Sequence, residues 1–463
     1  MAISRREFTR LLAGGGAFAA MGQLSRTASM AAPAVGGYRA MVGVFLFGGN
    51  DAWNMVVPTD GRYSTYAATR NPALVLPRTS LMSLGSSGYG LHPAFAPLQN
   101  VWNEGALNVL LNTGSLFQPL TKATYQSRPD LVPTNLMSHA DEQAHWQGNR
   151  VRGVSVDGYM GRLADKMSSN GLSPMISVAG SNLITIGKSS SPLVLPSTGT
   201  IVRNGYTAGS TNAAVSARQA ALESFASGGA MGNVTGLTGD ALARAYSQAA
   251  TANGIVSSTT STVDQYFRNP NNGVALTSDI SRQLLRAARM IEARDGLGHG
   301  RQVFFVSQGG YDTHSGQTDG QGSPTTGTQA NLYSDLAMAL AGFYNAMKAL
   351  GMQNNVTAFT MSDFGRVFKG NAQNGSDHAW GSNHLIVGGG LARRQVLGRY
   401  PDMALGGPDD IANDGRWIPS VSIEEYIGSI AMWHGVSSVD MPYVFPNWAT
   451  WNGGGRGPVP FFT

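Results

Sequence analysis

The sequence VFFVSQGGYDTH occupies residues 303–314 and joins a run of four apolar residues to an aspartate and a histidine. The run VFFV predicts a buried β-strand, because short apolar runs rich in β-branched and aromatic residues are typical of strands inside a parallel sheet. Asp312 and His314 follow this strand. They are two residues apart, so in an extended segment both side chains face the same way and can reach one metal ion. A hydrogen-bonded Asp-Thr-His turn is the alternative.

A second strand-to-loop junction occupies residues 356–366, with the sequence VTAFTMSDFGR. Asp363 follows the predicted strand there. In open α/β sheets, ligands bind at the carboxyl ends of the strands, and carboxylates and imidazoles at those ends are suitable ligands for a divalent cation. We therefore expect Asp363 to bind a metal and Arg366 to hold an anionic group. An ion pair beside a helix N-cap would use the same two residues.

Two further segments carry possible metal ligands. Residues 38–47 predict a first buried strand, and the GGND sequence after it ends at Asp51. Two glycines allow a tight turn, so we expect the Asp51 carboxylate at the same edge of the sheet, with an Asx-turn as the alternative. The sequence DHAWGSNH at 377–384 supplies His378 and His384, which we expect to complete the site.

A candidate nucleophile lies in the sequence SHADEQAHW, which begins at Ser138. Ser138 precedes a predicted helix over 139–149, whose N-terminus would stabilise an anion. Ser-x-x-Asp is also a capping box, a structural role without chemistry. Thr113 and Ser115, just after another predicted strand, are the competing hydroxyls. His139 and the histidine six residues later either line the same cleft or form the polar face of the helix.

Strands and helices alternate in the C-terminal half. Strands are predicted at 302–307, 355–361 and 384–388, and a helix at 329–350 lies between the first two. This alternation is typical of parallel β-α-β units, so we expect an α/β fold with a mostly parallel sheet. Residues 165–275 break the alternation and are low in charge. We interpret them as an insertion or cap over the sheet.

The first 34 residues indicate export. Arg5 and Arg6 form a twin-arginine pair before an apolar run at 11–21, which is too short to span a bilayer, and Ala-Pro-Ala at 32–34 fits a cleavage site. We therefore expect residues 1–34 to be a twin-arginine signal peptide and the protein to be periplasmic or secreted, with a retained anchoring helix as the alternative. The absence of cysteine excludes disulfides and thiolate ligands. No basic run indicates a nucleic-acid partner.

These motifs together resemble a known family. The twin-arginine leader, G-G-N-D, S-H-x-x-x-Q-x-x-W, G-x-D-T-H, and S-D-F-G-R followed by D-H-x-x-G resemble the domain of unknown function 1501 family. That family is similar to the alkaline phosphatase and sulfatase superfamily. The resemblance covers nearly the whole chain after residue 34. It implies one alkaline-phosphatase-like domain over 35–463, an α/β/α sandwich with a metal site at the carboxyl edge of its sheet.

The resemblance also implies roles for individual residues. The implied metal ligands are Asp51, Asp312, His314, Asp363, His378 and His384. Ser138 takes the place of the nucleophile, and Phe364 stands where alkaline phosphatases usually have a histidine, which favours loss of a second cation.

The expected protein is an exported metal-dependent hydrolase of phosphate or sulfate esters, with a small-molecule or glycan ester as substrate. Its cofactor would be zinc, manganese, magnesium or calcium, and the twin-arginine export machinery would be its partner. The alternative is a non-catalytic exported binding protein that keeps the fold with an incomplete metal site.

Overall fold

The structure, a computed structural model, describes residues 37–167, 171–203, 210–227 and 234–462. The predicted signal peptide, residues 1–34, lies outside the described residues. Within the described ranges, no helix is both long and apolar enough to cross a membrane.

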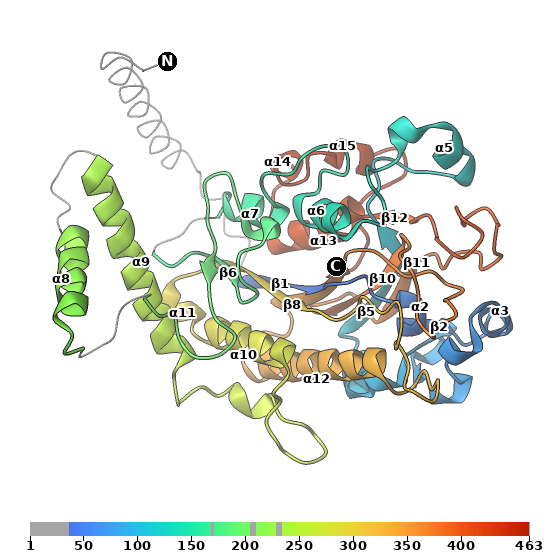
Figure 1. The fold of residues 1–463 in the computed structure, drawn as a ribbon, viewed down its shortest axis with the longest axis horizontal. Coiled ribbons are helices and arrows are strands. Elements are labelled where there is room, and N and C mark those ends of the chain that lie inside the picture. The colour runs from blue at the N-terminus through green and yellow to red at the C-terminus, as the bar shows by residue number, and fades with distance from the viewer. Residues whose placement is uncertain (1–36, 168–170, 204–209, 228–233, 463) are drawn as a thin grey trace.

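A nine-stranded sheet forms the centre of the described chain (Figure 1). Its strands are β1 (Arg39–Leu46), β5 (Leu107–Gly114), β6 (Met175–Ser177), β7 (Leu193–Val194), β8 (Arg301–Gln308), β9 (Val356–Ser362), β10 (Ser382–Gly388), β11 (Gln395–Gly398) and β12 (Val421–Ser422). The order is β11-β5-β10-β9-β1-β8-β6-β7, and β12 also pairs with β5. A small second sheet contains β2 (Val56–Pro58), β3 (Met82–Ser83) and β4 (Tyr89–Leu91).

The predicted α/β class with a mostly parallel sheet is confirmed, with one strand reversed. β10 runs antiparallel to both β9 and β5, whereas the other pairings of the large sheet are parallel. The segment 363–381 between β9 and β10 contains no helix. A parallel strand requires a crossover connection, usually a helix, so a β9–β10 connection made only of loop fits an antiparallel strand.

Three adjacent parallel strands end together at one edge of this sheet. β1 lies between β9 and β8, and Leu46 at its end is in register with Ser362 and Gln308. The loops that follow these strands therefore leave the sheet at the same place. This arrangement brings the predicted site segments together, although they are far apart in sequence.

Helices cover both faces of the sheet (Figure 1). α10 (Asp279–Glu292) and α12 (Thr328–Ala349) lie on one face, and α6 (His139–Gly148), α7 (Tyr159–Ala164) and α13 (Ile423–His434) lie on the other. Alternate residues of β1 pack into two separate cores, with Val42 and Val44 on the α12 side and Met41 and Phe45 on the α13 side. This is the two-residue period of a strand buried on both faces.

The other α-helices of the described residues are mostly short. They are α2 (Ala52–Met55), α3 (Tyr63–Thr69), α4 (Gln99–Asn103), α5 (Lys122–Ser127), α8 (Ala213–Ser227), α9 (Val234–Val256), α11 (Arg294–Leu297), α14 (Met441–Val444) and α15 (Trp448–Trp451). The segment 165–275, interpreted from the sequence as an insertion or cap, supplies β6 and β7 to the sheet. It also supplies α8 and α9, which lie together at one end of the molecule in Figure 1.

Candidate metal centre

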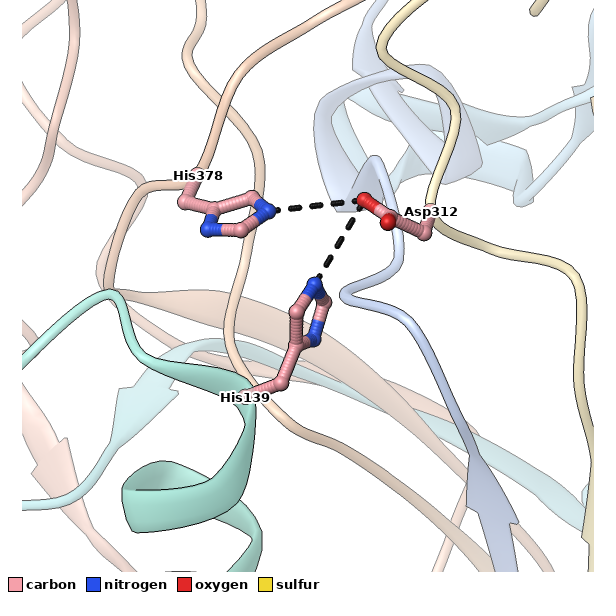
Figure 2. Close-up of side chains that lie close together, drawn as sticks. All are labelled: His139, Asp312 and His378. Carbon is pink, nitrogen blue, oxygen red and sulfur yellow. Dashed lines mark hydrogen bonds and ion pairs between the residues drawn. The ribbon is translucent and has the colours of Figure 1, made fainter.

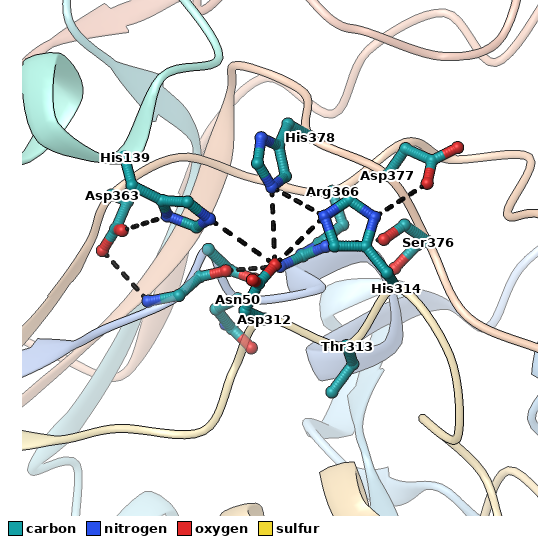
Figure 3. A network of polar contacts seen from close by, with 12 residues as sticks. Asn50, His139, Asp312, Thr313, His314, Asp363, Arg366, Ser376, Asp377 and His378 are labelled. Atoms are coloured by element: carbon teal, nitrogen blue, oxygen red, sulfur yellow. Dashed lines mark hydrogen bonds and ion pairs between the residues drawn. The ribbon is translucent and has the colours of Figure 1, made fainter.

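Three imidazoles converge on one carboxylate at the edge of the sheet (Figure 3), and Figure 2 shows two of them, His139 and His378, with Asp312. The Oδ1 atom of Asp312 lies 3.5 Å from Nε2 of His139, 3.2 Å from Nε2 of His314 and 3.4 Å from Nε2 of His378. His139, Asp312 and His378 each offer a ligand atom within 4.8 Å of the other two. This donor set is close enough to hold a metal ion.

The four side chains come from three parts of the fold. Asp312 and His314 lie in the loop after β8, His378 lies in the loop between β9 and β10, and His139 is the first residue of α6. Asp312 can approach closely because Gly48 after β1 has no side chain. A Cβ atom on Gly48 would lie 2.4 Å from the backbone nitrogen of Asp312, and its φ of +115° also favours glycine.

In each of the three histidines, Nδ1 lies within hydrogen-bond distance of an oxygen acceptor. The pairs are His139 with Asp363 Oδ2 at 2.7 Å, His314 with Asp377 Oδ1 at 2.9 Å, and His378 with the Met137 carbonyl at 2.8 Å. Carbonyl and carboxylate oxygens only accept, so the proton of each neutral imidazole is assigned to Nδ1. The lone pair of each Nε2 atom therefore points into the centre.

The short contact between His314 and His378 favours a cation in the centre when both rings carry their proton on Nδ1. Their Nε2 atoms are 2.8 Å apart. Two lone pairs that face each other at this distance repel, and a proton or a metal cation between them removes the repulsion. The nitrogen of His139 and the oxygen of Asp312, which form a close group with Nε2 of His378, favour the metal over a proton.

The electrostatics of the centre favour the forms that bind metals. Partial burial alone would raise the pKa of Asp312, but the ion pair with Arg366 and the nearby His139 and His314 lower it to about 2. Burial lowers the pKa of His378, and Arg366 and the neighbouring imidazoles lower it further. A carboxylate and a neutral imidazole are the protonation states that metal binding requires.

Asp363, predicted as a ligand, lies on the Nδ1 side of the His139 ring, away from Asp312. Its side chain is fully buried. One oxygen accepts from the backbone N–H of Gly48 at 3.2 Å, and the other accepts from His139 Nδ1 at 2.7 Å and from the Gln143 amide at 2.8 Å. The structure therefore joins Asp363 to the centre through an imidazole ring (Figure 3).

Arg366, predicted to hold an anionic group, is also fully buried. Its guanidinium donates to the carbonyls of Gly48, Gly49 and Ser376 at 2.5, 2.8 and 2.6 Å, and to Asp312 Oδ1 at 2.5 Å. These contacts fix the loops around the centre and the position of the Asp312 carboxylate.

The structure places two other predicted ligands outside the convergent group. Asp51 forms a buried ion pair with Arg70 at 2.5 Å and accepts from the Gln317 amide at 2.6 Å. The ring of His384 stacks on Tyr426 with centroids 5.4 Å apart, and neither ring nitrogen has a hydrogen-bond partner. Burial lowers the pKa of His384 to about 3.

The candidate nucleophiles have other partners. The Ser138 hydroxyl donates to Asp141 at 2.6 Å, and Ser138 is the N-cap of α6 without a side-chain hydrogen bond to the helix backbone. Ser115 donates to Glu142 at 3.3 Å, and Thr113 is fully buried. None of these contacts directs a hydroxyl to Asp312.

His139 was not predicted as a ligand from the sequence, and no role was predicted for Asp377. A usable signal was the spacing of His139 and Gln143, four residues apart on one helix face. Both side chains contact the same oxygen of Asp363.

Comparison with known proteins gives one family. The chain matches the family described as "Protein of unknown function (DUF1501)" over residues 86–410. This region contains all four residues of the convergent group. No curated protein matches the chain.

Proposed function

The chain belongs to the DUF1501 family, and from the geometry of its histidine–aspartate centre we propose that it is a metal-dependent hydrolase of phosphate or sulfate esters. The observation that carries the proposal is the convergence of three Nε2 atoms on Asp312 Oδ1, with each Nδ1 atom held by an acceptor. The Asp312 and His314 side chains are 50% and 47% exposed, which leaves the centre open to a substrate.

The donor set favours a transition metal. Imidazole nitrogens suit zinc and related ions, whereas magnesium and calcium prefer a shell of oxygen atoms. Of zinc, manganese, magnesium and calcium, zinc fits best. A bound metal of this kind would polarise an ester oxygen and lower the pKa of a water molecule. The protein's part is to hold the four donors, with Arg366 fixing the carboxylate.

An alkaline-phosphatase-like arrangement with one cation is part of the proposal. It is supported by the parallel strands that end at the centre and by the helices on both faces of the sheet. Phe364 packs its ring against His139 and His378, with centroids 4.8 and 4.6 Å apart, so no second imidazole is available there. Asp51 is already neutralised by Arg70, which also argues against a second cation.

The test is hydrolysis by the metal-loaded protein. We expect turnover of 4-nitrophenyl phosphate, bis(4-nitrophenyl) phosphate or 4-nitrophenyl sulfate, and we expect Asp312→Ala to lose both metal and turnover. Asp130→Ala is the matched control, because Asp130 is an exposed aspartate paired with Arg128. If the metal-loaded wild-type protein hydrolyses none of the three esters, this result would contradict the proposed hydrolase activity.

A non-catalytic binding protein is the second candidate. It is favoured by the hydroxyl of Ser138, which donates to Asp141, and by the complete burial of Arg366. Calorimetry with inorganic phosphate and sulfate separates the two functions. Anion binding that requires the metal, without hydrolysis of any ester, would support this candidate.

We also propose export through the twin-arginine pathway, on the sequence of residues 1–34 alone. The variant with Arg5→Lys and Arg6→Lys should accumulate as cytoplasmic precursor. The same periplasmic yield as the wild type would contradict this part of the proposal.

A further inference from the structure

Two carboxylates of the centre contact its imidazoles on the side away from Asp312. Asp363 holds Nδ1 of His139, and Asp377 holds Nδ1 of His314. We propose that Asp363 and Asp377 are positioning residues, which act on the metal through these histidines, and that neither is a ligand. This inference rests on the proposed metal centre and gives Asp363 a different role from the one expected from the sequence.

Both carboxylate oxygens of Asp363 are engaged by the protein, and Oδ2 is directed to the Nδ1 side of His139. Its buried carboxylate accepts three hydrogen bonds, from Gly48, His139 and Gln143. The two nitrogens of an imidazole point outward in diverging directions, so Asp363 at Nδ1 and Asp312 near Nε2 lie on different sides of the His139 ring. The carboxylate therefore sets the orientation of the ring and fixes its proton on Nδ1.

Asp377 does the same for His314 from the solvent side. Its Oδ1 atom accepts from His314 Nδ1 at 2.9 Å and from the Asn371 amide at 3.1 Å, and its side chain is 48% exposed. The Asn371 amide also donates to the His314 carbonyl at 2.9 Å. Asn371 therefore contacts both the Asp377 carboxylate and the backbone of His314, the histidine that Asp377 orients.

His378 provides an internal reference for both aspartates. Its Nδ1 atom is held by the backbone carbonyl of Met137, which a side-chain substitution does not remove. Removing a carboxylate should therefore change the tautomer of one histidine and leave that of His378 unchanged. A general loss of structure would change the tautomers of all three histidines.

The experiment measures the histidine tautomers of the metal-free protein by long-range proton–nitrogen NMR of histidine-labelled samples. In the wild type we expect Nδ1 of His139, His314 and His378 to be protonated, with a further proton between the Nε2 atoms of His314 and His378 in place of the metal. Asp377→Ala should release the Nδ1 proton of His314 and leave His378 unchanged. Asp363→Ala should do the same for His139. Unchanged tautomers in both variants would overturn the inference.

Zinc titration gives the second readout. Asp377→Ala should still bind about one equivalent of zinc, with a Kd about 10- to 100-fold higher than that of the wild type, the usual effect of losing an outer-shell partner. Complete loss of zinc binding, as expected for Asp312→Ala, would make the aspartate a ligand and overturn the inference. Asp130→Ala should match the wild type. Because Asp363 is buried, Asp377→Ala keeps the test decisive if Asp363→Ala does not fold.

The two readouts separate this inference from the proposed function. A wild-type protein that binds no metal contradicts the metal centre, while the tautomers still show whether the aspartates orient the rings. Metal binding with an unchanged Kd in Asp377→Ala contradicts the positioning role and leaves the hydrolase proposal standing.

Discussion

The surroundings of a histidine decide its role in this protein. His384 has the same imidazole as the histidines of the centre, but it lies between Trp146 and Tyr426 with ring centroids 5.0 and 5.4 Å away. Neither of its nitrogens has a hydrogen-bond partner, and burial lowers its pKa to about 3. Its ring is therefore a neutral part of the core.

We predict that His384→Phe folds and retains the metal. No hydrogen bond is lost, so the free energy of unfolding at pH 7 should change by less than about 1.5 kcal/mol. Below pH 6.5 the unfolded state takes up a proton on His384 and the folded state does not, so the wild type loses stability as the pH falls from 6.5 towards 3.

Urea unfolding at pH 7 and pH 5 measures this difference. Between these pH values the free energy of unfolding should fall in both proteins. The fall should be smaller in His384→Phe, by up to about 2 kcal/mol. An equal loss in both proteins would contradict the pH effect. Loss of the metal in His384→Phe would restore His384 as a ligand.

The sequence allowed part of the centre to be predicted at the residue scale. Asp312 and His314 could be placed because they follow a buried strand at a spacing of two residues, and His378 because an aspartate and a second histidine lie close to it. The partner of Asp51 could not be predicted, since nothing in the spacing indicates the ion pair with Arg70.

At the element scale, the centre depends on the loops that follow β1, β8 and β9. Gly48 after β1 donates its N–H to Asp363, and its carbonyl accepts from Arg366. The same residue leaves space for the backbone of Asp312. This one glycine of the loop after β1 thus contacts both of the other loops.

We predict that Gly48→Ala raises the Kd for zinc by at least about tenfold, because a Cβ atom would displace Asp312 from its position against Gly48. Gly85→Ala is the matched control. Gly85 also has a positive φ, +61°, but its Cβ would meet nothing within 4 Å. Both substitutions carry backbone strain of about 1 kcal/mol or more. A wild-type Kd in Gly48→Ala would contradict the prediction.

The elements themselves were largely predictable from the sequence. The strands expected at 302–307, 355–361 and 384–388 are confirmed as β8, β9 and β10, and the helix expected at 329–350 is confirmed as α12. Apolar runs and helical periodicity are local signals. The direction of β10 was not predictable in this way, because it depends on the path of the loop before it.

At the scale of the whole molecule, a bound metal would join α6, the loop after β8 and the loop between β9 and β10. We therefore predict that zinc stabilises the folded protein. A ligand at 100 times its Kd contributes about 2.7 kcal/mol, which should raise the Tm by a few degrees. Thermal unfolding with and without zinc measures the shift, and a chelator should reverse it. The same shift in Asp312→Ala would show that zinc acts elsewhere.

The central claim is that His139, Asp312, His314 and His378 hold one metal ion. Elemental analysis of the wild-type protein and of Asp312→Ala, both purified without chelators and then titrated with zinc and manganese, tests it most directly. We predict about one equivalent of a transition metal in the wild type and none in the variant, because Asp312 carries the negative charge on which the three imidazoles converge. No metal in the wild type after titration, or equal metal in both proteins, would contradict the claim.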